Sequence, residues 1–400
     1  MINSVQMNLR ILLILCISNL AAMIGMGIIV PIFPLYLNKF NISGAMMGVI
    51  FSATSLSFAI FNPIMGRIAD RIGYKSLIVV GLLIRVPVAV SYVFASNMLF
   101  LIFIRLVEGV FVAMVSSSAG AYVAAISPKN KEGSYMGLFN TFFLLGFGAG
   151  PLLGGALTDL YDIDFPFYVL AVLFAISAFL VLLLVPERAD TEEQRHSETG
   201  QKNETSLKVL LSSRLIKGLF IIGFILSFAQ GALMVFLPVV AANKQLSMTE
   251  IGILTSSLML FAGFLQMPFG YLANKYNKIF LIISGIVMVS VIVSLIPHFS
   301  KFREFFALSL LGAIGTSLGN PAALALLIRA AKDGGFGLGF TIGAFNFAVG
   351  SGMIAGPVVS GVIMDVFSLN HLFYAISALC MLSSVIIYYS TRSGKDPGGE

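Results

Sequence analysis

Charged residues are scarce in this sequence: Asp, Glu, Lys and Arg make up 10% of its 400 residues, whereas 58% are hydrophobic. A soluble domain carries roughly a quarter of its residues as charges. So few charged side chains cannot cover a water-facing surface, and a mean hydropathy of +0.98 indicates that the solvent is lipid. Because backbone polar groups in lipid must pair internally, only helix bundles and closed barrels remain.

Cysteine and histidine are scarce as well. Cys16 and Cys380 lie far apart within apolar segments, which indicates neither a disulfide framework nor a metal site. The three histidines, His196, His298 and His371, are scattered, so a histidine metal cluster is equally unsupported. We therefore expect no metal and no bound cofactor.

Long apolar runs are what the sequence does have. They are about twenty residues long and do not alternate with polar residues, which excludes a membrane barrel and selects helices. The predicted fold is an all-α membrane protein with twelve transmembrane helices. The predicted spans are 11–37, 44–66, 76–96, 98–120, 134–157, 166–185, 215–240, 249–271, 278–297, 304–328, 336–360 and 370–390.

The distribution of Lys and Arg residues indicates which side of the membrane each loop lies on. With the N-terminus inside, 18 of the 24 Lys and Arg residues fall on the cytoplasmic side. The opposite side holds Lys39, Lys244, Lys301 and Arg303. This bias is a strong positive-inside signal, and it accounts for the net charge of +6 without a nucleic-acid partner. We expect a multi-pass protein of the cytoplasmic membrane with both termini in the cytoplasm.

An internal repeat divides the chain into two halves. At an offset of 204 residues Pro34 matches Pro238, and at an offset of 206 Asn140 matches Asn346 and Asp159 matches Asp365. The predicted domains are a six-helix bundle at 1–186, a mixed-charge cytoplasmic linker at 187–214 and a second six-helix bundle at 215–400. Because six is even, the repeat is parallel, and such halves typically enclose a site near the bilayer midplane.

Three motifs carry chemistry or tight packing. The segment from Gly66 to Lys75 is predicted to be a short loop between the second and third helices, with glycine in a tight turn and Asp70 accepting hydrogen bonds. A plain basic hairpin is the equally weighted alternative.

The fifth and eleventh helices repeat a glycine- and proline-rich face suited to close helix contact. The residues of that face are Gly146, Gly150, Pro151, Gly154 and Gly155, with Gly352, Gly356 and Pro357 in the second half.

The fourth helix places Arg105 and Glu108 on one face, three residues apart. Glu108 is the only carboxylate well inside a predicted span, and charges within spans are usually functional. Burial raises the proton affinity of a carboxylate, and a nearby arginine lowers it. Glu108 is therefore a candidate proton carrier, and a permanent ion pair with Arg105 is an alternative of equal weight.

Together these motifs resemble the major facilitator superfamily, and the pattern is most similar to its twelve-helix drug:proton antiporter branch, which includes tetracycline and multidrug efflux proteins. The resemblance covers essentially the whole chain. It implies that helices 1, 4, 7 and 10 line a central cavity. It also implies a rocker-switch cycle that exchanges protons for exported substrate. It further implies that Gly66, Asp70, Arg71 and Gly73 form a cytoplasmic latch and that Arg105 takes part in proton coupling.

Three positions depart from the family pattern. Glu108 stands where glutamine is common, and Ala125 stands where relatives often carry an acidic residue. The second-half copy of the latch has Asn274 for aspartate, so the latch is expected either to be weaker or to depend mainly on the first-half copy.

Polar and flexible side chains within the spans are candidates for the substrate cavity, although most Met and Phe residues are expected to pack helices or face lipid. The cavity candidates are Asn19, Met23, Met26, Asn140, Gln230, Met234, Thr316, Asn320 and Asn346. Arg85, in the third helix, has three open interpretations: it pairs with Glu108, lines a water path or marks a kink.

The leading hypothesis is a proton-coupled exporter of small hydrophobic or amphipathic compounds, acting as a monomer and not as an enzyme, with the proton gradient as its energy source. A facilitator or proton symporter for a metabolite is the first alternative, and a non-transporting membrane sensor is a remote one. A serine protease at Gly315–Gly319 is disfavoured, because that segment lies within a span and no histidine lies at its depth.

Overall fold

The computed structural model describes residues 2–40, 42–128, 132–187, 210, 213–334 and 338–392. Every regular element in these ranges is a helix, and none of them is a strand. Twelve helices are long and apolar enough to cross a membrane. The predicted all-α membrane fold with twelve spans is therefore confirmed.

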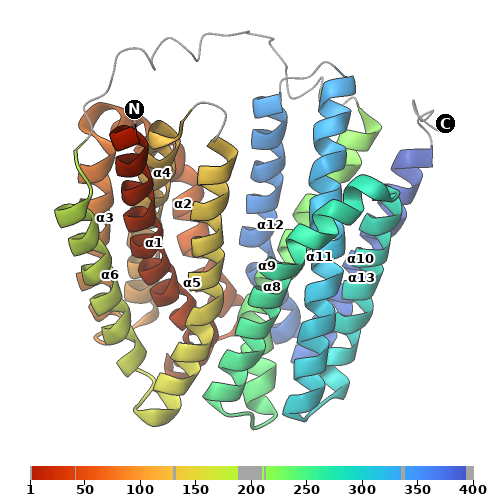
Figure 1. Ribbon diagram of the computed structural model, residues 1–400. Coiled ribbons are helices and arrows are strands. Elements are labelled where there is room, and N and C mark those ends of the chain that lie inside the picture. The colour runs from red at the N-terminus through yellow and green to blue at the C-terminus, as the bar shows by residue number, and fades with distance from the viewer. Residues whose placement is uncertain are drawn as a thin grey trace. The chain divides into compact units, whose positions relative to one another are not determined.

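Within each half of the chain, short connections join successive helices (Figure 1). The first half contains α1 (Ile2–Tyr36), the 3-10 helix η1 (Leu37–Phe40), α2 (Gly44–Ile72), α3 (Tyr74–Ser91), α4 (Met98–Ile126), α5 (Glu132–Leu160) and α6 (Phe165–Leu184). The second half contains α8 (Arg214–Asn243), α9 (Met248–Lys275), α10 (Lys278–Leu295), the 3-10 helix η4 (Ile296–His298), α11 (Phe302–Asp333), α12 (Leu338–Val366) and α13 (Leu369–Arg392).

Several helices continue past the predicted spans, because a helix that leaves the lipid keeps its backbone hydrogen bonds and can end in polar residues. The clearest case is α2, which runs on through Asp70 to Ile72. The predicted loop from Gly66 to Lys75 is therefore wrong in extent. Gly73 alone connects α2 to α3, with a φ of 105° that favours glycine.

The chain forms two compact units. One contains Met1–Ile42, Val49–Glu198 and Gln245–Ser256, and the other contains Ser43–Gly48, Thr199–Lys244 and Ser257–Glu400. The first turn of α2 thus belongs with the second unit, and the first turns of α9 belong with the first unit. Most of the predicted linker at 187–214 lies outside the described residues.

The same packing plan occurs in both units. In the first unit α1 packs against α5 and α6, and α3 packs against α4 and α6. In the second unit α8 packs against α12 and α13, and α10 packs against α11 and α13. These pairs correspond in sequence order, so the internal repeat seen in the sequence is also a repeat of helix contacts.

Glycines bring the backbones of α1 and α5 together. Gly146, Gly150 and Gly154 lie four residues apart on one face of α5. A Cβ added at any of the three would lie less than 3.0 Å from an α1 carbonyl, namely those of Leu20, Ile24 and Ile28 in turn. Two helices can approach this closely only where one of them lacks side chains.

The second unit repeats this contact between α8 and α12. A Cβ at Gly352 would meet the carbonyl of Phe224, and one at Gly356 would meet the carbonyl of Phe228, both at less than 3.0 Å. The repeated glycine motif therefore has the same structural role in each unit. It lets α5 pack closely against α1 in the first unit and α12 against α8 in the second.

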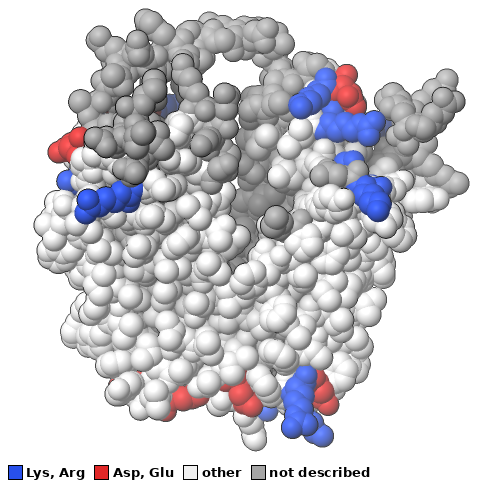
Figure 2. Space-filling view, in the orientation of Figure 1, with Lys and Arg blue, Asp and Glu red and all other residues white. Residues whose placement is uncertain are grey.

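Charged side chains gather at the helix ends. In the face drawn in Figure 2, Lys, Arg, Asp and Glu side chains lie toward the two ends of the helices, and uncharged residues form the surface between them. Large apolar side chains such as Phe103, Val172 and Phe179 are exposed along these helices. Exposed apolar surface of this extent is what a lipid environment stabilises.

Gly150→Ala should lower the melting temperature of the purified protein, because the added methyl group meets backbone atoms that cannot move aside. Overpacking of this kind costs about 1–3 kcal/mol, which outweighs a helix-propensity gain of at most about 1 kcal/mol. Gly137→Ala in the same helix is the matched control, since no atom lies within 4 Å of its added Cβ. The control should be neutral or stabilising, and equal losses at the two positions would contradict the assigned packing.

Candidate functional site

A buried ion pair lies in the first unit, on α4. The Nη1 of Arg105 donates to Oε2 of Glu108 at 3.0 Å. The two residues are 6% and 2% exposed. Asn97 caps the start of α4 by accepting from the backbone N–H of Phe100, and the helix then carries both charges to one face, as the spacing of three residues predicts.

The carboxylate of Glu108 has a second donor. The hydroxyl of Tyr92, just after α3, donates to the same Oε2 at 2.6 Å. Tyr92 is itself fully buried, and its ring contacts Phe33 and Phe167. Two donors, one on α4 and one at the end of α3, therefore converge on one oxygen of the buried carboxylate.

Aromatic rings surround the other side of the Arg105 guanidinium. Its carbon lies 4.3 Å from the ring centre of Phe33 and 5.1 Å from that of Phe51. Its Nε donates to the carbonyl of Ile50 at 3.4 Å. The guanidinium thus joins α1, α2 and α4 through stacking and hydrogen bonds that a lysine could not supply.

Close contact between α2 and α4 secures this arrangement. A Cβ added to Gly109 would lie less than 3.0 Å from Ser57 and from the carbonyl of Thr54. The hydroxyls of Thr54 and Ser57 donate to the α4 carbonyls of Arg105 and Leu106 at 3.1 and 2.7 Å. The glycine that follows Glu108 is therefore required by the packing at the ion pair.

Arg85, on α3, is the third buried charge. It is 1% exposed, and none of its three guanidinium nitrogens has a hydrogen-bond partner. The guanidinium carbon lies 3.8 Å from the ring centre of Phe174 on α6. The predicted hydrogen-bonded pairing of Arg85 with Glu108 is absent, since Arg105 and Tyr92 occupy the carboxylate instead.

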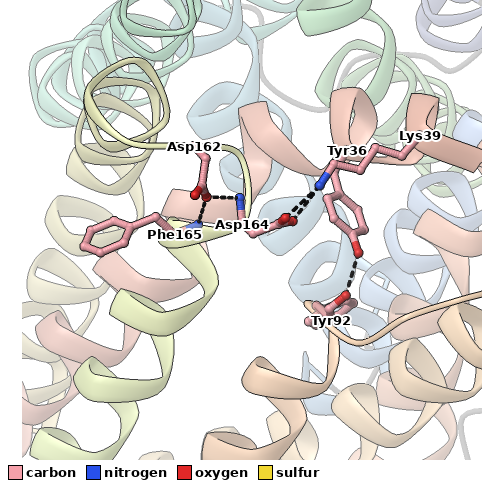
Figure 3. A network of polar contacts seen from close by, with 6 residues as sticks. All are labelled: Tyr36, Lys39, Tyr92, Asp162, Asp164 and Phe165. Atoms are coloured by element: carbon pink, nitrogen blue, oxygen red, sulfur yellow. Dashed lines mark hydrogen bonds and ion pairs between the residues drawn. The ribbon is translucent and has the colours of Figure 1, made fainter.

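A polar network extends from Tyr92 toward the end of α1 (Figure 3). The hydroxyl of Tyr36 donates to the backbone carbonyl of Tyr92. Beside it, Lys39 on η1 pairs with Asp164 at 2.7 Å and lies 4.9 Å from the ring centre of Tyr36. Asp162 accepts from the backbone N–H groups of residues 164 and 165, which fixes the turn that presents Asp164.

The candidate latch residues lie at the α2–α3 junction. The carboxylate of Asp70 accepts from the hydroxyl of Tyr74 at 3.1 Å, and both Asp70 and Arg71 are exposed. Gly66 lies within α2, where an added Cβ would come no nearer than 4.0 Å to Ser117. Only Gly73 has the turn function predicted for the glycines of this segment.

The ends of the repeated glycine motif contact helix starts that belong to the other half of the sequence. In the first unit, Asp159 of α5 accepts from the backbone N–H groups of Met248 and Thr249 at 3.1 and 2.7 Å. A Cβ at Gly155 would meet the carbonyl of Met248. The carboxylate thus satisfies free N–H groups at the start of α9 and faces the positive end of its dipole.

The second unit contains the repeat-related contact. Asp365 of α12 accepts from the backbone N–H groups of Gly44 and Ala45 at 2.6 and 2.8 Å, at the start of α2. A Cβ at Gly361 would meet the carbonyl of Gly44. The matched aspartates of the two repeats therefore perform the same capping role.

Asp159→Ala should lower the stability of the purified protein, because two backbone donors at the start of α9 lose their acceptor. Loss of a capping side chain costs about 0.5–2 kcal/mol. Asp333→Ala is the control, since Asp333 is an exposed carboxylate whose ion pair with Arg329 is also exposed. Thermal unfolding of both variants in detergent gives the comparison, and an Asp159 loss no larger than that of the control would refute the capping role.

The cavity candidates are distributed over both units. In the first unit Asn140 is exposed on α5, Met26 is half-buried, and the Nδ2 of Asn19 is buried without a partner. Met23 is buried with its Cβ close to Gly146, so it packs α1 against α5.

In the second unit the amides of Gln230, Asn320 and Asn346 are exposed. Met234 is half-buried, and the hydroxyl of Thr316 donates to the carbonyls of its own helix at residues 312 and 313. Four amides from the sequence-derived set are thus exposed, whereas Met23 and Thr316 already have intramolecular contacts.

Sequence reasoning missed Tyr92, Tyr36 and the capping role of the two aspartates. A tyrosine near the end of an apolar helix has no distinctive neighbours in the sequence, so Tyr92 gave no signal. Asp159 and Asp365 did give one, because both recur at the same repeat offset and both follow the glycine motif. What the sequence could not supply was the partner, which is the start of a helix about 90 residues later or 320 residues earlier.

Twelve spans built from two repeated sets of helices, with a buried ion pair in one of them, define a class of secondary membrane transporters rather than enzymes. The sequence profile of the Major Facilitator Superfamily matches residues 15–228 and 219–399. The chain therefore belongs to that superfamily, as its motifs suggested.

Known relatives agree with this assignment. The chain is 27% identical to an uncharacterized MFS-type transporter of Methanocaldococcus jannaschii, over 94% of this chain and 96% of that protein. It is 26% identical to the multi-drug resistance efflux pump PmrA of Streptococcus pneumoniae, over 90% and 91% of the two chains. Among solved structures, a bacterial homologue of the human lysosomal transporter Spinster matches with a TM-score of 0.81 at 15% identity, covering 97% of this chain and 98% of that one.

Proposed function

We propose that this protein exports small hydrophobic or amphipathic compounds in exchange for protons, and that Glu108 carries the proton. The observation that carries the proposal is the burial of Glu108, the only buried carboxylate among the described residues, in an ion pair with Arg105. An ionisable group at such depth destabilises the fold unless it is paired, so it is a candidate for function.

The contacts of Glu108 suggest how a proton would act. Binding a proton neutralises the carboxylate and weakens the acceptor that Arg105 and Tyr92 share. The guanidinium would then be a buried charge without a counterion, which is unfavourable until water or another acceptor reaches it. Because Arg105 also contacts α1 and α2, this change is transmitted to the packing of three helices and can bias alternating access.

The substrate class rests on the amides and on the relatives. Asn140, Gln230, Asn320 and Asn346 provide hydrogen-bonding groups on otherwise apolar helices, which suits compounds with a few polar atoms. PmrA, similar over nine-tenths of the chain, is described as a multi-drug efflux pump. Met26 and Met234 add side chains that adapt to varied shapes.

The proposed membrane location and orientation follow from the distribution of Lys and Arg residues. The excess of Lys and Arg on one side supports a cytoplasmic location for both termini and the cytoplasmic membrane as the site of the chain. There a monomer would work with substrate, protons and lipid as its only partners, without a cofactor. Asp70 and Arg71, at the junction of α2 and α3, would form the cytoplasmic latch.

Transport in proteoliposomes tests the proton role. Under an imposed pH gradient the wild type should accumulate a fluorescent cationic dye on the acidic side, and Glu108→Gln should abolish the dependence on the gradient, because the amide cannot bind and release a proton. Glu187→Gln is the matched control, since Glu187 is an exposed carboxylate that accepts from Ser76. Gradient-driven uptake that persists in the Glu108 variant would remove Glu108 from the proposal, and accumulation on the alkaline side would favour a symporter.

The substrate amides have a separate test. Asn346→Ala and Asn140→Ala should each raise the KM for export about fivefold, which corresponds to losing one hydrogen bond of about 1 kcal/mol. Thr141→Val is the control next to Asn140, because the Thr141 hydroxyl is already bonded to the carbonyl of Gly137. Equal KM values for the Asn140 variant, the control and the wild type would exclude Asn140 from the substrate site.

A further inference from the structure

Five aromatic side chains pack together at one end of the first unit. This aromatic cluster consists of Phe33, Tyr36, Phe51, Tyr92 and Phe167. Five pairs of its rings have centres 5.1–6.5 Å apart, which is the range of packed aromatic rings. Apart from Phe51, each of these residues is at most 2% exposed. The cluster is therefore a dense block of rings and not a loose group on the surface.

The aromatic cluster lies between Glu108 and the end of the unit at which α1 passes into η1, here called the η1 end. Tyr36 is the last residue of α1, and Phe167 lies in the first turn of α6. Glu108 lies ten residues after the start of α4, roughly 15 Å along the helix. Tyr92 joins the two levels, because its backbone carbonyl accepts from Tyr36 and its hydroxyl donates to Glu108.

The aromatic cluster offers water few polar partners. Its only polar side-chain atoms are the hydroxyl groups of Tyr36 and Tyr92, and both already donate their hydrogens within the unit. A buried water needs about two to four polar partners, and an apolar constriction excludes water. At the outer edge of the cluster, Lys39 pairs with Asp164 and lies over the ring of Tyr36, which ties η1 to the start of α6 (Figure 3).

The internal repeat indicates that the fold alone does not require these rings. At an offset of 204 the positions of Phe33, Tyr36, Phe51 and Tyr92 are occupied by Leu237, Val240, Thr255 and Ile296. Only Phe167 has an aromatic counterpart, Phe373, at an offset of 206. The described residues of the second unit also include no buried charge. The rings therefore accompany the buried ion pair rather than the helix packing that both units share.

We propose that the aromatic cluster is a seal that closes the η1 end of the first unit to water, so that a proton cannot reach Glu108 from that end in this arrangement of the helices. The rings of Phe33 and Tyr92 contact the ion pair itself, and those of Tyr36 and Phe167 close the space above them. This inference deepens the proposed function and rests on it for its meaning in transport.

Chemical labelling measures the access of water to Glu108. The full-length protein in lipid nanodiscs is treated with a water-soluble carbodiimide and glycinamide, which convert accessible carboxyl groups to amides, and the labelled peptides are quantified by mass spectrometry. Glu187 is the internal reference, because it is exposed. In the wild type Glu108 should react at about a tenth of the rate of Glu187 or less, since its reaction requires a local opening.

Two variants remove a ring without changing a residue that touches the ion pair. Phe167→Leu and Tyr36→Leu should each raise the labelling rate of Glu108 at least about fivefold, because local openings become more frequent when packing is lost. Tyr36→Phe loses the hydroxyl but keeps the ring, so its rate should stay within about twofold of the wild type. Phe373→Leu is the matched control, since Phe373 is 0% exposed and holds the repeat-related position in the second unit. It should leave the labelling of Glu108 unchanged.

Several results would overturn the seal. One is an unchanged rate in both ring variants, and another is wild-type labelling of Glu108 as fast as that of Glu187. Equal rises in Tyr36→Phe and Tyr36→Leu would assign the protection to the hydrogen bond instead of the ring. An equal rise in Phe373→Leu would reveal a general loosening of the protein. If one ring variant does not fold, the other decides, because the two rings come from different helices.

Because the labelling involves no substrate, it succeeds or fails independently of the transport assay. Faster labelling in the ring variants together with proton-independent export would retain the seal and reject the proposed coupling. Proton-coupled export that depends on Glu108, with unchanged labelling in the ring variants, would retain the coupling and reject the seal.

Discussion

Backbone-to-backbone contact at glycine faces is the constraint on which the rest of this structure depends. In lipid, helices gain little from hiding apolar side chains, so their association relies on close packing. Gly146, Gly150 and Gly154 let α5 lie against successive carbonyls of α1, and Gly352 and Gly356 do the same for α12 against α8. A side chain at any of these positions would push the helices apart, and the neighbouring contacts would be lost with them.

The buried charges depend on that packing. Arg105 joins three helices only because Gly109 lets α2 approach α4, and because Phe33 on α1 lies over the guanidinium. Glu108 in turn depends on Tyr92, whose position is fixed by aromatic contacts with α1 and α6. The charged cluster therefore has little freedom to adjust locally.

The capping aspartates show a different use of the repeat. Each aspartate lies one residue before the last residue of its glycine-rich helix. Each accepts hydrogen bonds from the start of a helix in the other half of the sequence. The starts of α9 and α2 thereby obtain acceptors in addition to the local caps that Ser247 and Ser43 supply.

The sequence by itself determined the solvent, the helical class, the number of spans, the duplication and the placement of Arg105 and Glu108 on one helix face. These properties follow from composition, from apolar run length and from the three-residue spacing on one helix, all of which are local. It did not determine the extent of α2, because a helix end outside the lipid is not marked by hydrophobicity. It also did not determine which donors reach Glu108, which helix starts Asp159 and Asp365 cap, or that Arg85 would be buried without a partner. Those outcomes depend on which helices become neighbours, and only the tertiary structure decides that, because side chains far apart in sequence meet through the packing of backbones.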